Sequence, residues 1–353
     1  MFHTQSQPIP SSMVASGRLL SGEPRISAVT QPIRDVIVRV PYETLERLGY
    51  AKGSYNPRTP EEVAVLLGEV KHCERWEANG STGYNALSAA SRLGSSGDLV
   101  GLIGDDNAGS LFREQARQEE IHLSLPPIPG AMTAVCVSLV TPDGERTMVT
   151  SLGVAAQLGR VHLENVNYAG TRWLLLDGYF LVGSDENYSA FYEALSAVTG
   201  SAAKGIFPVS SEHVAQLKRE EILESILPRI HLLAANEREA LALTGAPDVP
   251  GALSALERRV PAAIITAGAA GSWTSHEGQR FFTPAVTSGT QVVDTTGAGD
   301  AYLGAFVAGV MQGVTPRAAS TGAARIAAMA VSNYTARLPQ FAREEWWRAI
   351  ETA

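Results

Sequence analysis

Short apolar segments alternate with longer helix-like segments along almost the whole chain from about residue 25. Six apolar segments end in small or polar residues, as buried strands do, and they lie at 25–33, 97–104, 171–180, 203–209, 229–237 and 261–268. Helical periodicity lies between them, at 85–93, 109–120, 186–198, 211–227 and 237–243. This alternation predicts an α/β fold whose largely parallel sheet is covered on both faces, with ligands at the carboxyl ends of the strands.

Two segments interrupt the alternation. Residues 35–49 and 134–151 have the alternating pattern of strands, and the second contains a turn at Pro142-Asp143-Gly144. We expect them to form a small β-rich lid, contributed by about residues 35–80 and 131–152. Residues 1–24 are polar and rich in Ser, Gln and Pro, which predicts a flexible tail before one domain at 25–353.

The composition excludes several classes of protein. The 353 residues are 45% hydrophobic, enough for one large core or two modest domains, and the net charge of -8 argues against nucleic acid or an anionic membrane as partner. No segment has the apolar length of a membrane span, and the N-terminus lacks the pattern of a signal peptide, so we expect a cytoplasmic protein. Cys73 and Cys136 lack metal-ligand spacing and are interpreted as reduced thiols.

Residues 291–313 predict a strand, a turn of small residues and then an apolar helix that begins at or near Asp300. The turn Gly297-Ala298-Gly299 has no bulky side chain, so its N–H groups can approach an anion, and the helix dipole points to the same place. A carboxylate at Asp300 could accept a proton from an attacking hydroxyl; the alternative is a helix cap. Neither a P-loop nor a GxGxxG fingerprint occurs in the chain.

Residues 294–300, Asp-Thr-Thr-Gly-Ala-Gly-Asp, resemble the C-terminal signature of the ribokinase-like (PfkB) family of carbohydrate and nucleoside kinases. The resemblance extends over about residues 25–340. It implies a ribokinase-like three-layer α/β/α core with a lid, and ATP as phosphate donor with Mg²⁺. It also implies that Asp300 is the catalytic base and that the 297–299 turn is the anion hole. In this family Asp294 and Thr296 match positions implicated in binding a monovalent cation, here K⁺.

Three further segments resemble nucleotide-binding parts of the family. Asn236 and Glu239 match its Asn-x-x-Glu motif, which holds Mg²⁺ and phosphate through water, although the same residues could simply cap a helix. The 266–271 segment matches its Thr-x-Gly-x-x-Gly turn and implies ATP contacts from Thr266, Gly268 and Gly271; an ordinary turn is the alternative. Residues 325–338 resemble the stretch around adenine in inosine-guanosine and adenosine kinases, with Asn333 as a nucleotide contact.

The substrate residues are inferred from two other resemblances. Residues 31–35 resemble a segment of adenosine kinases whose Asp binds ribose hydroxyls, which makes Asp35 the substrate anchor and Gln31 a second contact; a solvated lid residue is the alternative for Asp35. Gly80, Ser81 and Asn85 resemble the signature Gly-Gly-x-x-x-Asn, with Ser81 where the second Gly belongs.

Arg146 follows the hairpin turn, where nucleoside kinases of the family carry a lid arginine that could clamp the phosphate; the alternative is a solvated hairpin charge. These resemblances favour a kinase for the 5′-hydroxyl of a nucleoside, in particular a purine nucleoside. A sugar kinase for ribose, fructose or a related sugar, a kinase of a specialised metabolite and a non-catalytic regulatory paralogue stay open. The chain could be a monomer or a homodimer.

Overall fold

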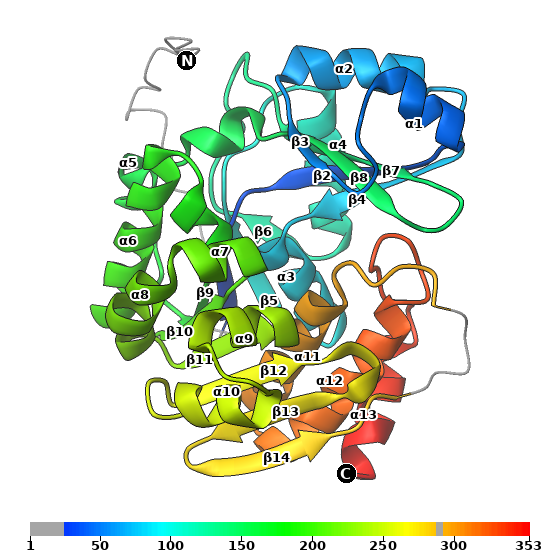
Figure 1. Ribbon diagram of the computed structural model, residues 1–353. Coiled ribbons are helices and arrows are strands. Elements are labelled where there is room, and N and C mark those ends of the chain that lie inside the picture. Colours follow the sequence, from blue (N-terminus) through cyan, green and yellow to red (C-terminus); the bar gives the residue numbers. More distant parts are fainter. Residues whose placement is uncertain (1–24, 287–291) are drawn as a thin grey trace.

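The larger of two sheets has nine strands in the order β14-β13-β12-β11-β10-β9-β1-β5-β6 in the computed structural model, which describes residues 25–286 and 292–353 (Figure 1). The strands from β12 to β6 in this order run parallel to one another, and β13 pairs antiparallel with both β12 and β14. The bounds are β1 Arg25–Val29, β5 Ser96–Val100, β6 Ile121–Leu123, β9 Thr171–Leu176, β10 Lys204–Pro208, β11 Leu232–Asn236, β12 Ala262–Thr266, β13 Ser272–His276 and β14 Gln279–Thr283. Five of the six apolar segments contain one of these strands, and the sixth, 97–104, overlaps β5, which begins one residue earlier, so the predicted parallel sheet is confirmed.

Helices cover both faces of this sheet, which makes the predicted three layers. Along β9, Leu174 and Leu176 pack into one hydrophobic cluster, whereas Trp173 and Leu175 pack into the other. The first cluster includes residues of α5 Arg160–Leu163, α6 Asp185–Thr199, α7 Glu212–Leu217, α9 Glu237–Thr244 and α10 Val249–Leu256. The second includes residues of α3 Thr82–Arg92, α4 Asn107–Gln118, α11 Ala298–Met311, α12 Pro316–Ala330 and α13 Ala342–Glu351. Burial on both faces explains why strands such as β9 and β12 have apolar side chains at successive positions.

A second, smaller sheet lies beside the carboxyl ends of the parallel strands (Figure 1). Its order is β3-β8-β7-β2-β4, and its strands are β2 Ile33–Arg39, β3 Tyr55–Pro57, β4 Arg75–Gly80, β7 Ala134–Val140 and β8 Arg146–Ser151. Its outer face packs on α1 Tyr42–Leu48 and α2 Pro60–Glu69 through residues such as Val36, Val38 and Leu66. The intervening residues, such as Asp35 and Ile37, therefore point toward the larger sheet.

The structure corrects three local predictions. Residues 42–48 of the expected strand segment form helix α1, because Leu45 is needed to cover the smaller sheet. The helix expected at 211–227 is broken into α7, α8 Arg219–Glu221 and a π-helical turn at Ile222–Ile226. Residues 292–294 form no strand; the N–H groups of Val293 and Asp294 donate to the Val331 carbonyl at 2.9 and 3.2 Å instead. Residues 1–24 and 291 lie outside the described residues.

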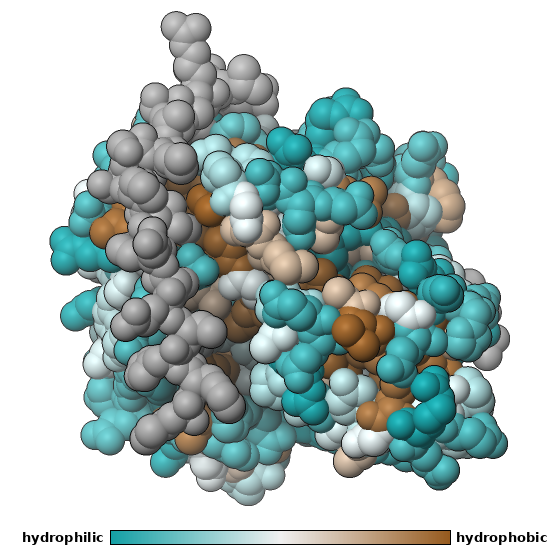
Figure 2. All heavy atoms as spheres, turned by 90° about the horizontal axis from the view of Figure 1, so that it is seen from above, coloured by the Kyte–Doolittle hydropathy of each residue, from teal (hydrophilic) through white to brown (hydrophobic). Residues whose placement is uncertain are grey.

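Seen from above, the surface is mostly hydrophilic, with hydrophobic residues gathered toward its middle (Figure 2). In the described ranges, no helix has both the length and the apolar character needed to cross a membrane.

Candidate active site

Polar residues at the ends of three parallel strands are tied together by one buried carboxylate. Asp177 follows β9, and its Oδ2 accepts a hydrogen bond from Thr30 Oγ1 at 2.7 Å. Its Oδ1 accepts from Ser210 Oγ and from the Tyr179 N–H, both at 3.1 Å. Because these contacts fix the ends of β1, β9 and β10, they define the floor of the site. Sequence reasoning missed Asp177, although a polar residue that ends a buried strand was a signal for it.

Asn236 and Thr266 lie side by side, because β11 and β12 pair them in register. Asn236 also caps α9: its Oδ1 accepts from the Glu239 N–H at 3.0 Å, and its N–H and Nδ2 donate to the Glu239 carboxylate at 2.9 and 2.7 Å. Glu239 is buried, and burial raises its pKa. Each of its carboxylate oxygens can still accept a second hydrogen bond. The pair therefore fits a role in holding Mg²⁺ through water, as well as the capping role.

Two glycines shape the turn after β12. Gly271 has a φ of +100°, and a Cβ there would lie 2.4 Å from the Thr283 carbonyl oxygen, so only glycine fits. Gly268 has a φ of +52° and open space around its Cα. The backbone at Gly268 is therefore accessible to a ligand beside Thr266.

Helix α11 begins with the glycine turn that the sequence singles out. Gly297 is its N-cap with a φ of +75°, and a Cβ at Gly299 would meet nothing within 4 Å. The first turn of a helix leaves backbone N–H groups without helical partners, and the helix dipole adds positive charge there. The Ala298 N–H already donates to the Thr295 carbonyl at 3.3 Å, whereas the backbone at Gly299 is open to an anion.

Asp300 stands in the first turn of α11 and is half-buried. Its Oδ2 accepts a hydrogen bond from Asn85 Nδ2 at 3.0 Å, and the helix has no side-chain cap, which counts against the capping alternative. Loss of solvation raises the pKa of Asp300 to about 7, opposed by the Asn85 hydrogen bond and assisted by the carboxylates of Asp177 and Glu239. A carboxylate with that pKa can both take up and release a proton near neutral pH.

Asp35 lies on the inner face of the smaller sheet, against Gly80 of β4. A Cβ at Gly80 would lie 2.0 Å from Asp35 Oδ2, so this glycine makes room for the carboxylate. Burial raises the pKa of Asp35 to about 6, and the guanidinium groups of Arg337 and Arg146 oppose that shift. Asp35 is half-buried, so it differs from the solvated residue of the alternative interpretation.

Gln31 is buried, and its Nε2 donates to Asn187 Oδ1 at 2.6 Å. The Asn187 amide in turn donates to the carbonyls of Ala155 and Leu158 at 3.0 and 3.1 Å. The amide nitrogen of Gln31 is therefore engaged in joining β1 to α6, whereas the sequence placed it against the substrate.

Ser81 adopts a backbone conformation that normally requires glycine, with φ 110° and ψ 155°. Its hydroxyl caps α3 by accepting from the Tyr84 N–H at 3.1 Å. The chain thus keeps the backbone shape that a glycine would adopt at this position.

Replacing Ser81 with Gly is expected to stabilise the protein by about 1 kcal/mol. Relief of the strain contributes about 1–3 kcal/mol; loss of the cap costs a few tenths, and the extra freedom of glycine in the unfolded chain costs about 0.5–1 kcal/mol. Thermal and urea unfolding of the two proteins measure the difference. A lower Tm for Ser81→Gly would show that the hydroxyl contributes more than the strain costs.

Arg146 reaches from β8 of the smaller sheet to the segment before α11. Its guanidinium contacts Asp294 Oδ1 and donates to Thr296 Oγ1, so it is not the freely solvated charge of the alternative interpretation. Asp294 Oδ1 also accepts from the Thr296 N–H at 2.8 Å. Asp294 Oδ2 is buried, with no hydrogen-bond partner in residues 25–286 and 292–353. That oxygen is a suitable ligand for a monovalent cation, so the residues fit one.

Asn333 is exposed in the turn after α12, and the next residues contact the smaller sheet. The ring of Tyr334 stacks on Trp76 of β4 with centroids 4.2 Å apart, and its hydroxyl accepts from Arg39 Nη2 at 2.7 Å. Arg337 donates to Asn85 Oδ1 at 2.8 Å. The sequence marked the 325–338 segment but missed Tyr334 and Arg337, because their partners lie far away in the chain.

Large apolar side chains stay exposed beside these polar groups. Tyr55 and Met148, paired across β3 and β8, are 56% and 38% exposed, and Tyr179 after β9 is 43% exposed. Burial raises the pKa of the Tyr179 hydroxyl, and the nearby charges of Asp177, Glu239 and Asp300 raise it further. Tyr179 is therefore near Asp300, and apolar surface beside these polar groups is exposed to a ligand.

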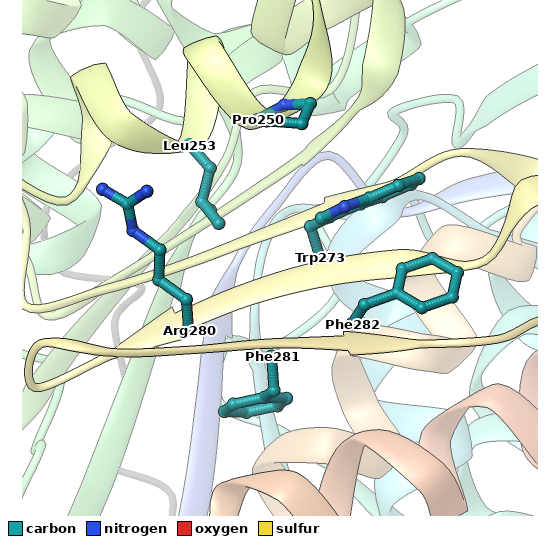
Figure 3. Close-up of a pocket in the computed structure, with 6 residues that line it drawn as sticks. All are labelled: Pro250, Leu253, Trp273, Arg280, Phe281 and Phe282. Atoms are coloured by element: carbon teal, nitrogen blue, oxygen red, sulfur yellow. The ribbon is translucent and has the colours of Figure 1, made fainter.

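A separate pocket of about 220 Å³ contains none of these residues. It lies between α10 and the β13–β14 hairpin, where Trp273 and Phe282 lie side by side facing Leu253, while Phe281 points to the opposite face (Figure 3).

The comparisons with known proteins described next all find kinases. The profile of the pfkB family carbohydrate kinase domain matches residues 64–342. The solved adenosine kinase from Sinorhizobium meliloti has a TM-score of 0.81 and 27% identity, with 94% of this chain and 100% of that chain covered. The adenosine kinase of Schizophyllum commune is 25% identical over 82% of this chain and 89% of its own length. The fructokinase of Klebsiella pneumoniae is 26% identical over 65% of this chain and 76% of its own length.

Proposed function

Because the chain belongs to the pfkB family of kinases, which transfer phosphate to hydroxyl groups, we propose that it phosphorylates the primary (5′) hydroxyl of a nucleoside, and of a purine nucleoside in particular. The observation that carries this proposal is the position of Asp300 in the first turn of the helix after the Gly297–Gly299 turn. A base beside an anion-binding helix start is the arrangement that phosphate transfer to a hydroxyl requires.

Two features favour a nucleoside over a free sugar. Asp35 on the smaller sheet can accept hydrogen bonds from two neighbouring ribose hydroxyls. Tyr55, Met148 and Tyr179 offer exposed apolar surface that a flat base would cover, whereas a small polar sugar would leave it exposed. Adenosine kinases among the relatives are consistent with this preference.

The proposed reaction uses the described residues as follows. Thr266, Gly268, Gly271 and Asn333 bind ATP, and Arg146 together with the amides of the Gly297–Gly299 turn receives the transferred phosphate. Mg²⁺, held through water by Asn236 and Glu239, would neutralise phosphate charge. The smaller sheet acts as a lid that excludes water and so limits ATP hydrolysis. Asp300 takes the proton of the primary hydroxyl while that oxygen bonds to the γ-phosphorus and the bond to the ADP oxygen breaks.

ADP release from ATP, measured against a panel of nucleosides and sugars, tests this function. We expect turnover with purine nucleosides and little with ribose or fructose. Each assay is run in K⁺ and in an equal concentration of Na⁺, because Asp294 Oδ2 fits a monovalent cation; we expect faster turnover in K⁺. Turnover with sugars alone would establish a sugar kinase instead. Nucleotide binding without any turnover would indicate a regulatory protein.

The pH dependence of kcat/KM should report the raised pKa of Asp300. The carboxylate must be ionised to accept a proton, and its pKa of about 7 is well above the usual 3.8. We therefore expect kcat/KM to rise between about pH 6 and pH 8 with a midpoint near 7. Initial rates at acceptor concentrations well below KM, in overlapping buffers of constant ionic strength, give the curve. A flat profile down to pH 5 would contradict a base with a raised pKa.

A further inference from the structure

Arg337 lies in the segment after α12, which packs directly on the start of α11. The preceding residue, Ala336, has a φ of +54°, and a Cβ at Gly297 would lie 2.8 Å from the Ala336 Cβ and 3.2 Å from Asn85 Nδ2. The glycine turn, the 336–337 segment and Asn85 therefore touch one another. A shift in any one of them would move the other two.

The guanidinium of Arg337 is held from several sides. Its Nη2 donates to Asn85 Oδ1 at 2.8 Å and also to the carbonyl of Asn79 in β4. Its Nη1 is 3.6 Å from Glu119 Oε2, and the group lies 5.1 Å from the centre of the buried Tyr84 ring. The side chain is only 19% exposed. Arg337 is therefore a fixed cation.

This contact decides which way the amide of Asn85 points. Arginine has only donors, so it must face the oxygen of the amide, and the amide nitrogen is then left to donate to Asp300 at 3.0 Å. If the amide turned over, its oxygen would face the Asp300 carboxylate, and the two acceptors would repel each other. Arg337 thus stabilises the one orientation in which Asn85 supports an ionised Asp300.

Arg337 also acts on the proposed substrate anchor. Asn79, whose carbonyl it binds, precedes Gly80, on which the Asp35 carboxylate rests. Among neighbouring charges, Arg337 has the largest effect on the pKa of Asp35, which it lowers, and it also lowers that of Asp300. One cation therefore lies behind both carboxylates of the cleft.

We propose that Arg337 is a positioning residue for phosphate transfer: it orients the Asn85 amide toward Asp300 and so, through Asn85, joins helix α11 to strand β4 beneath Asp35. This inference rests on the proposed function in one respect, the role of Asp300 as the base. It is independent of whether the acceptor is a nucleoside or a sugar.

The test compares Arg337→Met, Arg337→Lys, Asn85→Ala and the double variant Asn85→Ala/Arg337→Met, with whichever acceptor wild type turns over. In Arg337→Met we expect the plateau kcat at high pH to fall about tenfold or more, because the base is misoriented. We also expect the rise of activity with pH, called here the acid limb, to have its midpoint about one pH unit higher, because a cation near Asp300 is lost. Arg337→Lys keeps the charge without the planar fork, so its limb should stay near that of wild type while its plateau falls.

The double variant shows whether Arg337 acts through Asn85. If it does, adding Arg337→Met to Asn85→Ala leaves the plateau kcat nearly unchanged. Independent, multiplying losses would overturn the proposal, and so would an unshifted acid limb in Arg337→Met. Arg259→Met is the matched control: Arg259 pairs with Glu224 at 2.8 Å and belongs to no part of the candidate site, so its loss should leave the limb and the plateau as in wild type.

A measurement without substrate separates this inference from the proposed function. The pKa values of the aspartate carboxyls can be followed by ¹³C NMR titration, with the Asp300 signal assigned from its absence in Asp300→Asn. We expect the Asp300 pKa to be higher in Arg337→Met than in wild type. An unchanged pKa would overturn the inference whether or not an acceptor is found, whereas absence of turnover with a raised pKa would overturn only the proposed function.

Discussion

Replacing Asp300 with Asn is expected to lower kcat by about 10²–10⁴-fold, the usual contribution of a general base, with KM for both substrates nearly unchanged. The substitution keeps the shape of the side chain beside Asn85 but removes its ability to accept a proton. Steady-state kinetics at saturating ATP and acceptor measure the loss. A kcat within a few-fold of wild type would refute the role of Asp300.

Stability supplies the control for that variant. The pKa of Asp300 is about 7 in the folded protein and near the usual 3.8 in the unfolded chain, so the folded state binds the proton more tightly. The contribution of Asp300 to the free energy of unfolding therefore decreases as the pH rises from about 4 to about 7. Asp300→Asn lacks this dependence and should be at least as stable as wild type at pH 8. A loss of activity with an unchanged or higher Tm at pH 8 then reports chemistry and not unfolding.

Replacing Asp35 with Asn is expected to reduce kcat/KM for a nucleoside by about 10²–10³-fold, mainly through KM. Two hydrogen bonds from ribose hydroxyls to a carboxylate are each worth about 1.5–3 kcal/mol, and an amide oxygen can replace them only in part. Kinetics with the nucleoside and with its 2′- and 3′-deoxy analogues measure the effect. The variant should discriminate against the deoxy analogues much less than wild type does.

Gly80→Ala is a matched test of the same anchor. A methyl group at Gly80 would lie 2.0 Å from Asp35 Oδ2, so the carboxylate must move away from its place on β4. We expect the same rise in KM with the charge still present. If Asp35→Asn and Gly80→Ala both bind the nucleoside as wild type does, Asp35 does not anchor the substrate.

Local features of the sequence predicted most of the fold. Strands such as 171–176 are apolar on both faces, and helices such as α9 begin at capping residues. The spacing of apolar residues and the capping residues therefore indicated where the strands and helices lie. Residues 42–48 were predicted as strand but form a helix. Their Leu45 covers the smaller sheet, and the surface of that sheet is made by other segments of the chain, which local sequence does not reveal.

The candidate site also has parts that the local sequence predicts and parts that depend on distant segments of the chain. Its turns and caps are local: Gly297 at the start of α11, the Asn236–Glu239 box and the glycine turn at 268–271 could all be expected from neighbouring residues. Gln31 was assigned to the substrate, yet its amide nitrogen donates to Asn187, which is 156 positions away. Such a partner cannot be inferred from the residues around Gln31.

The sequence by itself determined the parallel α/β architecture, the helix start that can hold an anion and the carboxylate placed within it, because periodicity, glycine turns and helix dipoles depend on neighbours in the chain. Only the tertiary structure decided the state of that carboxylate. Asn85, 215 positions from Asp300, contacts that carboxylate, and Arg337, 37 positions from Asp300, contacts Asn85. The loss of solvent that raises the pKa of Asp300 arises from the whole fold. Orientation and desolvation are properties of the assembled site, so no local pattern encodes them.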